Sequence, residues 1–175
     1  IAGCGKDGSS RVRVFNNKGE MANEFRAFSA QNSGGEVYVA VGDVIGDSQE
    51  EIIVGTGKGG TSKIAFFDVK GRRIKEFNAI KSRNGDVHVA AGDVLFGDKD
   101  EIIAGSGESS NSIVVYNSDG KILYKIASFG ERLNPNGDVY VASSNLIGNK
   151  KEEVIASTGA GGSSYVDVAE FKCDV

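Results

Sequence analysis

The sequence has few of the residues from which common catalytic sites are built. Its 175 residues include one histidine, two cysteines, one proline and no tryptophan. Ser-His-Asp catalysis would have to use His88, and no serine lies on a recognisable nucleophile turn. Neither cysteine lies beside a histidine or in a Cys-x-x-Cys pair. We therefore expect a protein that is not an enzyme, although glycosidase-like carboxylate pairs stay open because their geometry is spatial.

Long apolar runs and an excess of basic residues are also missing. No apolar stretch approaches the roughly 18 residues that a membrane-spanning helix needs. The net charge is −4 and the basic residues are scattered, so we expect neither nucleic-acid binding nor a membrane span. No segment of about ten residues keeps a helical period, which argues against helices.

The two cysteines lie near opposite ends of the chain, at Cys4 and Cys173. A disulfide between them would join the first segment to the last, and it would suit an oxidising compartment outside the cell. Two unpaired thiols are the alternative, because two cysteines carry little pattern information.

Glycine, in contrast, is abundant, with 25 residues that fall at fixed places in an internal repeat. The segments around Tyr38, His88 and Tyr140 read VYVAVGDVIGDSQEEIIVGTG, VHVAAGDVLFGDKDEIIAGSG and VYVASSNLIGNKKEEVIASTG. The first residues, IAGCGKDGSSRVRVF, enter the same unit part-way through. A period of about 50 residues is typical of repeat architectures, and a feature found once per repeat is expected to build the repeat.

Each repeat reads as four short strands separated by glycine-containing turns. In the first full copy the apolar runs are 37–41, 51–54, 63–67 and 73–77. The second run is continuously aliphatic, which predicts burial on both faces, whereas the fourth alternates and predicts one exposed face. This gradient is expected for a propeller blade. We predict a single all-β domain, a propeller-type array of four-stranded antiparallel blades with about three and a half repeats of ~50 residues.

The predicted units are a partial blade at residues 1–36, blades at 37–85 and 86–137, and a partial blade at 138–175. Propellers usually have about four to eight blades. The chain is therefore expected to belong to a longer parent chain, to complete a ring as a homo-oligomer, or to form a small open array. An open end would expose an apolar face and unpaired backbone, which favours association.

At the turn between its first two strands, the repeat resembles the FG-GAP repeat of integrin-α-like propellers, also called the VCBS type. The residues that carry the resemblance are Gly42 to Asp47 followed by Glu51 to Gly57. Segments 12–16, 64–68 and 113–117 are similar to the family's Val-Phe-Asp strand. The resemblance covers essentially the whole chain and implies a propeller fold. Propellers of this family serve adhesion, sugar binding and accessory roles in secreted enzymes.

The resemblance also implies a calcium site in this turn. Positions 1, 5 and 9 of the family's calcium loop fall on Asp43, Asp47 and Glu51, but position 3 falls on Ile45, which offers no oxygen. Calcium takes about six to eight oxygen ligands, so this set is incomplete. The corresponding residues of the later copies are Asp93, Leu95, Gly97 and Glu101, then Asn145, Ile147, Asn149 and Glu153. The alternative is a calcium-free turn in which the aspartates bind local backbone amides.

Two further patterns have structural explanations. Segment 55–60 fits the dinucleotide fingerprint G-x-G-x-x-G, but a strand follows it instead of the helix that such a site needs. His88 takes the repeat position of Tyr38 and Tyr140, and we expect these three side chains to form a ring along the centre of the array. Packing between blades is the favoured explanation of this ring, with ligand binding as the alternative.

The long loops that join successive blades differ between copies, and loops on a rigid scaffold commonly carry binding residues. Within them we expect the ligand contacts to be Asn32, Arg83, Arg132 and Asn134. The leading hypothesis is a non-enzymatic extracellular or cell-surface adhesion module that binds a protein or glycan through these loops, with self-assembly through the incomplete terminal blades. The alternative is an accessory propeller segment of a larger secreted carbohydrate-active enzyme. Calcium is the one cofactor implied.

Overall fold

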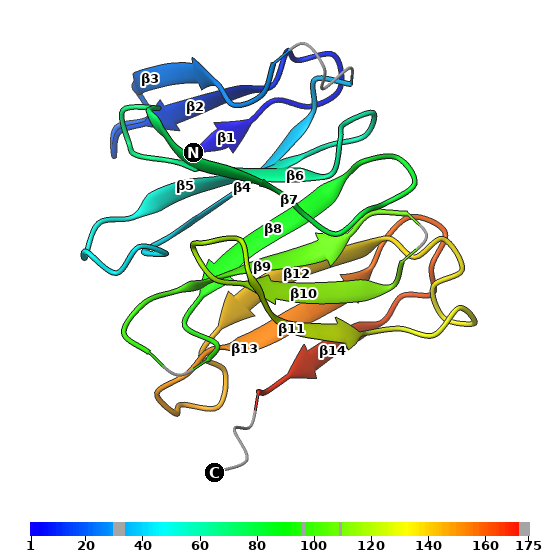
Figure 1. The fold of residues 1–175 in the computed structure, drawn as a ribbon. Coiled ribbons are helices and arrows are strands. Elements are labelled where there is room, and N and C mark those ends of the chain that lie inside the picture. Colours follow the sequence, from blue (N-terminus) through cyan, green and yellow to red (C-terminus); the bar gives the residue numbers. More distant parts are fainter. Residues whose placement is uncertain (30–33, 96, 109, 172–175) are drawn as a thin grey trace.

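The computed structural model describes residues 1–175 except 30–33, 96, 109 and 172–175, and this part of the chain forms strands without any helix. Fourteen strands make four antiparallel sheets that follow one another from top to bottom of Figure 1. Within each sheet, every strand pairs with its neighbours in the sequence, because short turns connect them. The prediction of an all-β protein is confirmed, whereas the radial arrangement of a propeller stays a prediction.

The four sheets repeat one pattern, complete in the middle of the chain. Sheet 1 contains β1 (Ala2–Gly3), β2 (Arg11–Phe15) and β3 (Met21–Arg26). Sheet 2 contains β4 (Val37–Gly42), β5 (Glu51–Thr56), β6 (Lys63–Phe67) and β7 (Arg73–Asn78). Sheet 3 contains β8 (Val87–Gly92), β9 (Glu101–Ser106), β10 (Ser112–Tyr116) and β11 (Ile122–Ala127). Sheet 4 contains β12 (Val139–Ser144), β13 (Glu153–Thr158) and β14 (Val166–Ala169). Within the described residues, sheet 1 has no counterpart of β4 and sheet 4 has no counterpart of β7.

Burial follows the predicted gradient across the two complete sheets. Every residue of β5 and β9 is buried, because these aliphatic strands pack against a neighbouring sheet on both faces. The outer strands β7 and β11 contain no buried residue, and β11 is largely exposed. The inner strands β4, β8 and β12 lie next to one another along one edge of the stack.

Three apolar cores fill the junctions between successive sheets. Between sheets 2 and 3, Ile64 and Phe66 pack in one cluster with Val114 and Tyr116. The cluster between sheets 3 and 4 contains Ile103, Ile113, Val115, Val139, Val154 and Ala156. The cluster between sheets 1 and 2 contains Val12, Val37, Ile52, Val54, Ala65 and Phe67. Sheets 2 and 3 therefore bury both of their apolar faces against neighbouring sheets, as the inner units of a repeat protein do.

Glycine sets the distance between sheets at one position of the repeat. A Cβ atom on Gly55 would lie 2.1 Å from the carbonyl oxygen of Val87, and one on Gly105 would lie 2.1 Å from that of Val139. Such distances are far inside van der Waals contact, so only glycine lets the next sheet approach this closely. The residue at the same register in sheet 4 is Ser157, and sheet 4 is the last sheet of the described chain.

Candidate functional site

Asp43 organises the β4–β5 turn, where the sequence predicts a calcium loop. Its Oδ1 accepts hydrogen bonds from the amides of Gly46 (2.7 Å) and Asp47 (3.1 Å), and its Oδ2 accepts one from Ser48 (2.8 Å). The Asp47 carboxylate accepts the amide of Gln49 at 3.0 Å. Both aspartates therefore stabilise the turn directly, as the calcium-free alternative proposed. Calcium binding in this turn stays a prediction.

Glu51, the predicted position 9 of that loop, is a buried anchor of the same turn. It accepts the amide of Ile45 at 3.2 Å, and Glu101 accepts the amide of Leu95 at 3.0 Å in sheet 3. Glu153 does the same for the β12–β13 turn. Burial raises the pKa of Glu51 and of Glu101, because it disfavours the charged carboxylate more than the amide hydrogen bonds favour it.

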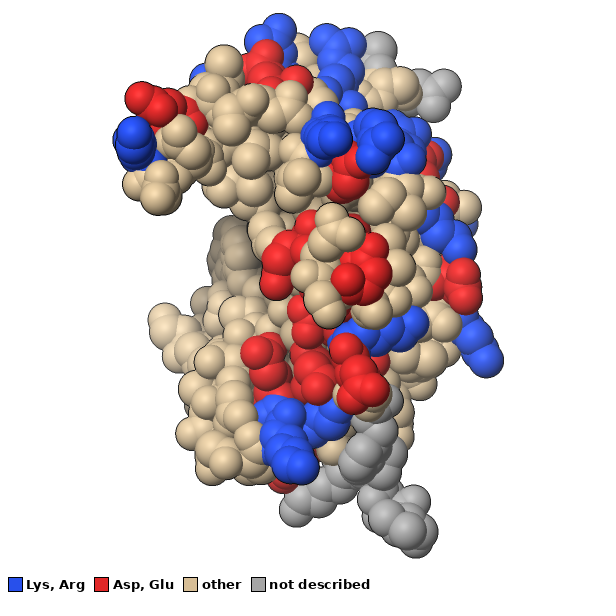
Figure 2. All heavy atoms as spheres, turned by 90° about the vertical axis from the view of Figure 1, so that its left-hand side faces the viewer, with Lys and Arg blue, Asp and Glu red and all other residues tan. Residues whose placement is uncertain are grey.

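The turns that connect β4 to β5, β8 to β9 and β12 to β13 form an acidic face. Figure 2 shows acidic side chains gathered over the middle of this face. Burial raises the pKa of Asp100, and the nearby charges of Glu152, Glu50 and Asp93 raise it further. Asp93, the first calcium-loop position of the second copy, accepts a hydrogen bond from the Lys151 ammonium at 2.5 Å. A cation in that loop would compete with this ammonium.

The predicted ligand-binding residues of the inter-sheet loops differ in their exposure to solvent. Arg83 and Arg132 have exposed side chains and stay candidates for ligand contact. Asn134 is fully buried, and its amide donates to the carbonyl of Asp138 at 2.7 Å, so it holds the loop rather than facing a ligand. Asn32 lies outside the described residues.

The predicted ring of Tyr38, His88 and Tyr140 is present as a stack. The His88 ring lies between the two tyrosine rings, with centroid distances of 4.2 Å and 4.0 Å. Its Nε2 lies 2.8 Å from Oδ1 of Asp138, a contact that joins sheet 3 to sheet 4. Although burial works against ionisation, the hydrogen bond and charge of His88 hold the pKa of Asp138 below its usual value.

Asp86 joins His88 and Asp138 in a buried group that the sequence reasoning missed. One ligand atom from each of these three residues lies within 4.8 Å of the other two, close enough to share a metal ion. The signal was available, because an acidic residue stands two positions before each residue of the stack: Glu36, Asp86 and Asp138. Nothing in one repeat alone indicates that the acids of sheets 3 and 4 meet at one histidine.

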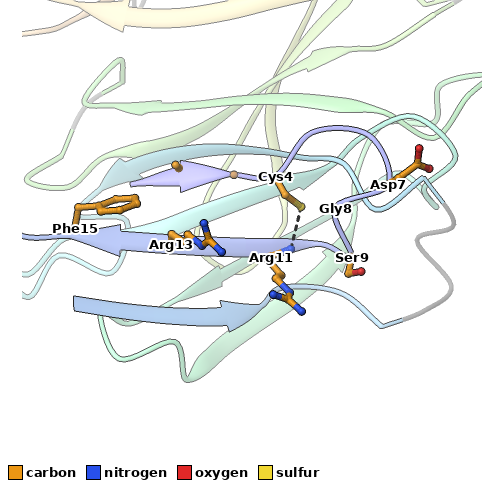
Figure 3. A pocket seen from close by; sticks show the side chains of 9 residues that line it. Cys4, Asp7, Gly8, Ser9, Arg11, Arg13 and Phe15 are labelled. Atoms are coloured by element: carbon orange, nitrogen blue, oxygen red, sulfur yellow. Dashed lines mark hydrogen bonds between the residues drawn. The ribbon is translucent and has the colours of Figure 1, made fainter. Parts of the chain in front are cut away.

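A hollow of about 470 Å³ opens on the outer face of sheet 1, lined in part by Arg11, Arg13 and Phe15 of β2 (Figure 3). Beside it, the Cys4 thiol donates to the carbonyl of Gly35 at 2.9 Å and accepts the amide of Arg11 at 3.0 Å. Cys4 is a free thiol, and its predicted partner Cys173 lies outside the described residues.

The outer face of sheet 4 carries apolar side chains that the inner sheets bury. Val166 and Val168 of β14 hold the same register as Ile113 and Val115 of β10. Val166 is 68% exposed and Val168 is half exposed, whereas Ile113 is 2% exposed and Val115 is fully buried. Tyr140, the last ring of the stack, is also exposed on sheet 4. An exposed apolar face of this kind is typical of an interaction surface.

Sheet 4 also has serine where a covered sheet has glycine. Ser144 occupies the register of Gly42 and Gly92, just as Ser157 occupies that of Gly105. A Cβ on Gly42 would lie 2.6 Å from the Cβ of Ala91, which belongs to the inner strand of the next sheet. The two serines therefore leave too little room for another inner strand at the spacing found between sheets 2, 3 and 4.

Comparison with known proteins bears on the fold. No family model matches the chain, and no curated protein matches it. Among solved structures, the chain is similar to Raptor from Chaetomium thermophilum, with a TM-score of 0.53 and 15% identity over 93% of this chain and 14% of Raptor. It is also similar to a protein of unknown function from Bacteroides caccae, with a TM-score of 0.51 and 14% identity over 97% of this chain and 57% of the other.

The chain thus spans less than two thirds of either solved structure, and at these identities the likeness concerns the all-β fold alone. Within the described residues, the protein also has no helix with the length and apolar character that crossing a membrane requires.

Proposed function

We propose that this chain is a non-enzymatic interaction module, a propeller-type array that associates head to tail with a second copy of itself. The outer face of sheet 4 on one copy would pack against the outer face of sheet 1 on the next. The observation that carries this proposal is the exposure of apolar residues at register positions that the inner sheets bury. The adjacency of β4, β8 and β12 along one edge supports the propeller-type arrangement.

The junctions inside the chain supply a template for the contact between copies. Between sheets 2 and 3, Phe66 packs in one cluster with Tyr116. Phe15 of sheet 1 holds the register of Tyr116, yet it is 41% exposed because no other sheet of the described chain covers it. Val168 holds the register of Phe66 at the opposite end. A second copy would therefore bring Val168 and Phe15 together as the internal junction brings Phe66 and Tyr116 together.

The two serines favour sheet 1 of a second copy over a complete sheet as the occupant. In the junction between sheets 3 and 4, the atoms closest to Gly92 belong to β12 and to the β12–β13 turn, and those closest to Gly105 belong to β12. Sheet 1 has no such inner strand within the described residues. Ser144 and Ser157 would therefore not clash with an inner strand when sheet 1 of a second copy covers them. A heterologous contact of this kind yields a ring if the rotation closes and a filament if it does not.

The wider role proposed for the module is extracellular or cell-surface adhesion, with a protein or glycan held by the loops that carry Arg83 and Arg132. This part rests on the FG-GAP resemblance and on the exposure of the two guanidinium groups. The alternative role, an accessory segment of a secreted carbohydrate-active enzyme, would require a catalytic domain in the same gene product. A glycan array tests the lectin version, and a clean absence of binding would remove it.

Light scattering over protein concentrations from about 1 µM to about 1 mM tests the association, since specific weak contacts fall in this range. We expect the mass of the unmodified chain to rise to at least that of a dimer. Val168→Asp places a charge in the proposed contact and should keep the protein monomeric. Val69→Asp is the matched control, because Val69 is an exposed apolar residue of a turn away from both faces. A monomer at all concentrations, or equal association of the Val168 variant, would refute the proposal.

A further inference from the structure

The packing of the repeat does not explain why two carboxylates, Asp86 and Asp138, are buried beside His88. All three side chains are buried, and Asp86 is fully buried. His88 contacts Asp138, whereas Asp86 accepts the hydroxyl of Ser82 on Oδ1 at 2.8 Å, and within the described residues its Oδ2 has no hydrogen-bond partner. Burying a carboxylate oxygen without a partner is costly unless a cation or a donor reaches it.

The charges of the group do not balance within it. Two carboxylates face one imidazole, so even a protonated His88 leaves one negative charge over. Lys58 is near enough to lower the pKa of Asp138, but its ammonium pairs with Glu108 at 3.7 Å. A divalent cation, which binds the neutral imidazole, would offset both carboxylate charges.

The other copies of the repeat show what is missing at Asp86. Glu36 accepts the backbone amide of Lys58 at 3.3 Å, and Asp138 accepts the amide of Ala160. These amides belong to the same loop position in sheets 2 and 4. Within the described residues, Oδ2 of Asp86 receives no such hydrogen bond. The backbone carbonyl of Asp86 still accepts the amide of Gly107, as the carbonyls of Glu36 and Asp138 accept the amides of the equivalent glycines. Asp86 is thus the one of the three acids with a free ligand atom, and it is the one beside the histidine.

We propose that Asp86, His88 and Asp138 bind a divalent transition-metal ion, with Zn²⁺ as the best match. One imidazole nitrogen and two carboxylate oxygens suit zinc, whereas calcium and magnesium prefer oxygen ligands alone. Three protein ligands leave the fourth tetrahedral position to water or to an incoming ligand. The ion would join the start of β8 to the start of β12, and so clamp sheet 3 to sheet 4.

To hold the ion, ligand atoms that now lie up to 4.8 Å apart would have to approach one another by up to about 1.5 Å. Zinc lies about 2.0–2.2 Å from nitrogen and oxygen ligands, which places two tetrahedral ligands roughly 3.3 Å apart. The distance between His88 Nε2 and Asp138 Oδ1, now 2.8 Å, would have to open by about half an ångström. The Tyr140 ring is stacked on one face of His88 and is itself exposed. This site does not depend on the association of copies, so a monomer that binds zinc would refute the proposed function alone.

Zinc titration of the chelator-treated chain, by calorimetry and by melting temperature, tests the proposal. We expect one zinc ion per chain and a rise of at least about 5 °C when free zinc is about 100 times the dissociation constant. His88→Tyr is the first variant, because tyrosine occupies this position in the other two copies and preserves the stack. It should weaken zinc binding by more than about tenfold. Equal binding by His88→Tyr, or no binding by the unmodified chain, would overturn the proposal.

Asp86→Asn is the second variant, since it leaves the contact between His88 and Asp138 in place. Without metal it should melt at the same temperature as the unmodified chain or higher, because it removes a buried charge. With zinc it should lose the rise. Asp43→Asn, a change in the distant β4–β5 turn, should keep both binding and the rise. If Asp86→Asn retains full zinc binding, or Asp43→Asn abolishes it, the site lies elsewhere and the assignment fails.

Discussion

Strands β10 and β14 occupy the same place in their sheets, yet one lies in a core and the other faces solvent. Ile113 and Val115 of β10 are buried by sheet 4, while the described residues include no sheet beyond Val166 and Val168 of β14. The residues are similar in type and identical in register. A neighbouring sheet therefore buries these positions in sheet 3, and the same positions stay exposed on the outer face of sheet 4. The account rests on this contrast between inner junctions and the last face.

The largest expected effect is a loss of stability when the apolar side chain is truncated at one of two equivalent positions, Ile113 of β10 and Val166 of β14. Ile113→Ala should lower the free energy of unfolding by about 2–5 kcal/mol, because it empties a filled junction. Val166→Ala should change it by no more than about 0.5 kcal/mol, as exposed substitutions generally do. Urea denaturation at a protein concentration low enough to keep the chain monomeric measures both. Comparable losses at the two positions would mean that β14 is covered within one chain.

The next effect tests the close approach that glycine permits. Gly105→Ser would drive a side chain into the carbonyl of Val139 and should cost about 1–3 kcal/mol or more. The reverse change in the last sheet, Ser157→Gly, should cost about 0.5–1 kcal/mol, from backbone entropy alone. Thermal unfolding of the two variants gives the comparison. An unperturbed Gly105→Ser variant would show that the junction tolerates a wider spacing.

The third prediction is that the buried glutamate of the turn stabilises sheet 3 and sheet 4 by similar amounts. Glu101 and Glu153 each anchor a turn of their own sheet, so replacing either by alanine should cost a similar amount, about 1–3 kcal/mol for the amides left without an acceptor. Denaturant unfolding of both variants measures this. A much smaller loss at Glu153 would mean that the last sheet is ordered differently from the others.

The fourth prediction concerns how the stability contributed by Glu101 depends on pH. Burial raises its pKa in the folded chain above the unfolded value of 4.5, so the folded state holds the proton more tightly. The resulting stability is fully present below the unfolded pKa and is lost as the pH rises through the folded pKa. Glu101→Gln, which keeps an oxygen acceptor, should remove this decline. Unfolding free energies measured from about pH 4 to about pH 8 would show it, and identical pH profiles for the two proteins would contradict it.

The smallest expected effect is that of calcium on the β4–β5 turn. Three backbone amides already occupy the Asp43 carboxylate, so millimolar calcium should raise the melting temperature by less than about 1 °C. The comparison uses the chelated chain and Asp43→Asn. A rise of several degrees that disappears in Asp43→Asn would instead establish the calcium loop that the family resemblance implies.

Repeat equivalence made much of this architecture predictable. The strand order and the stack of Tyr38, His88 and Tyr140 follow from residues that recur at a spacing of about 50. Asn134 could not be placed, because loop side chains have no period that tells inward from outward. Within one repeat Asp138 reads only as a turn residue, and its contact with His88 appears once two sheets are placed side by side.

Mixing two association-defective variants tests the head-to-tail contact most directly. Val168→Asp disables the sheet 4 face and leaves sheet 1 intact, whereas Phe15→Asp disables the sheet 1 face and leaves sheet 4 intact. Light scattering should find each variant monomeric alone and a one-to-one dimer in the mixture, because one sound pair of faces remains. A mixture that stays monomeric while the unmodified chain associates would contradict the account, since copies would then meet through some other pair of surfaces.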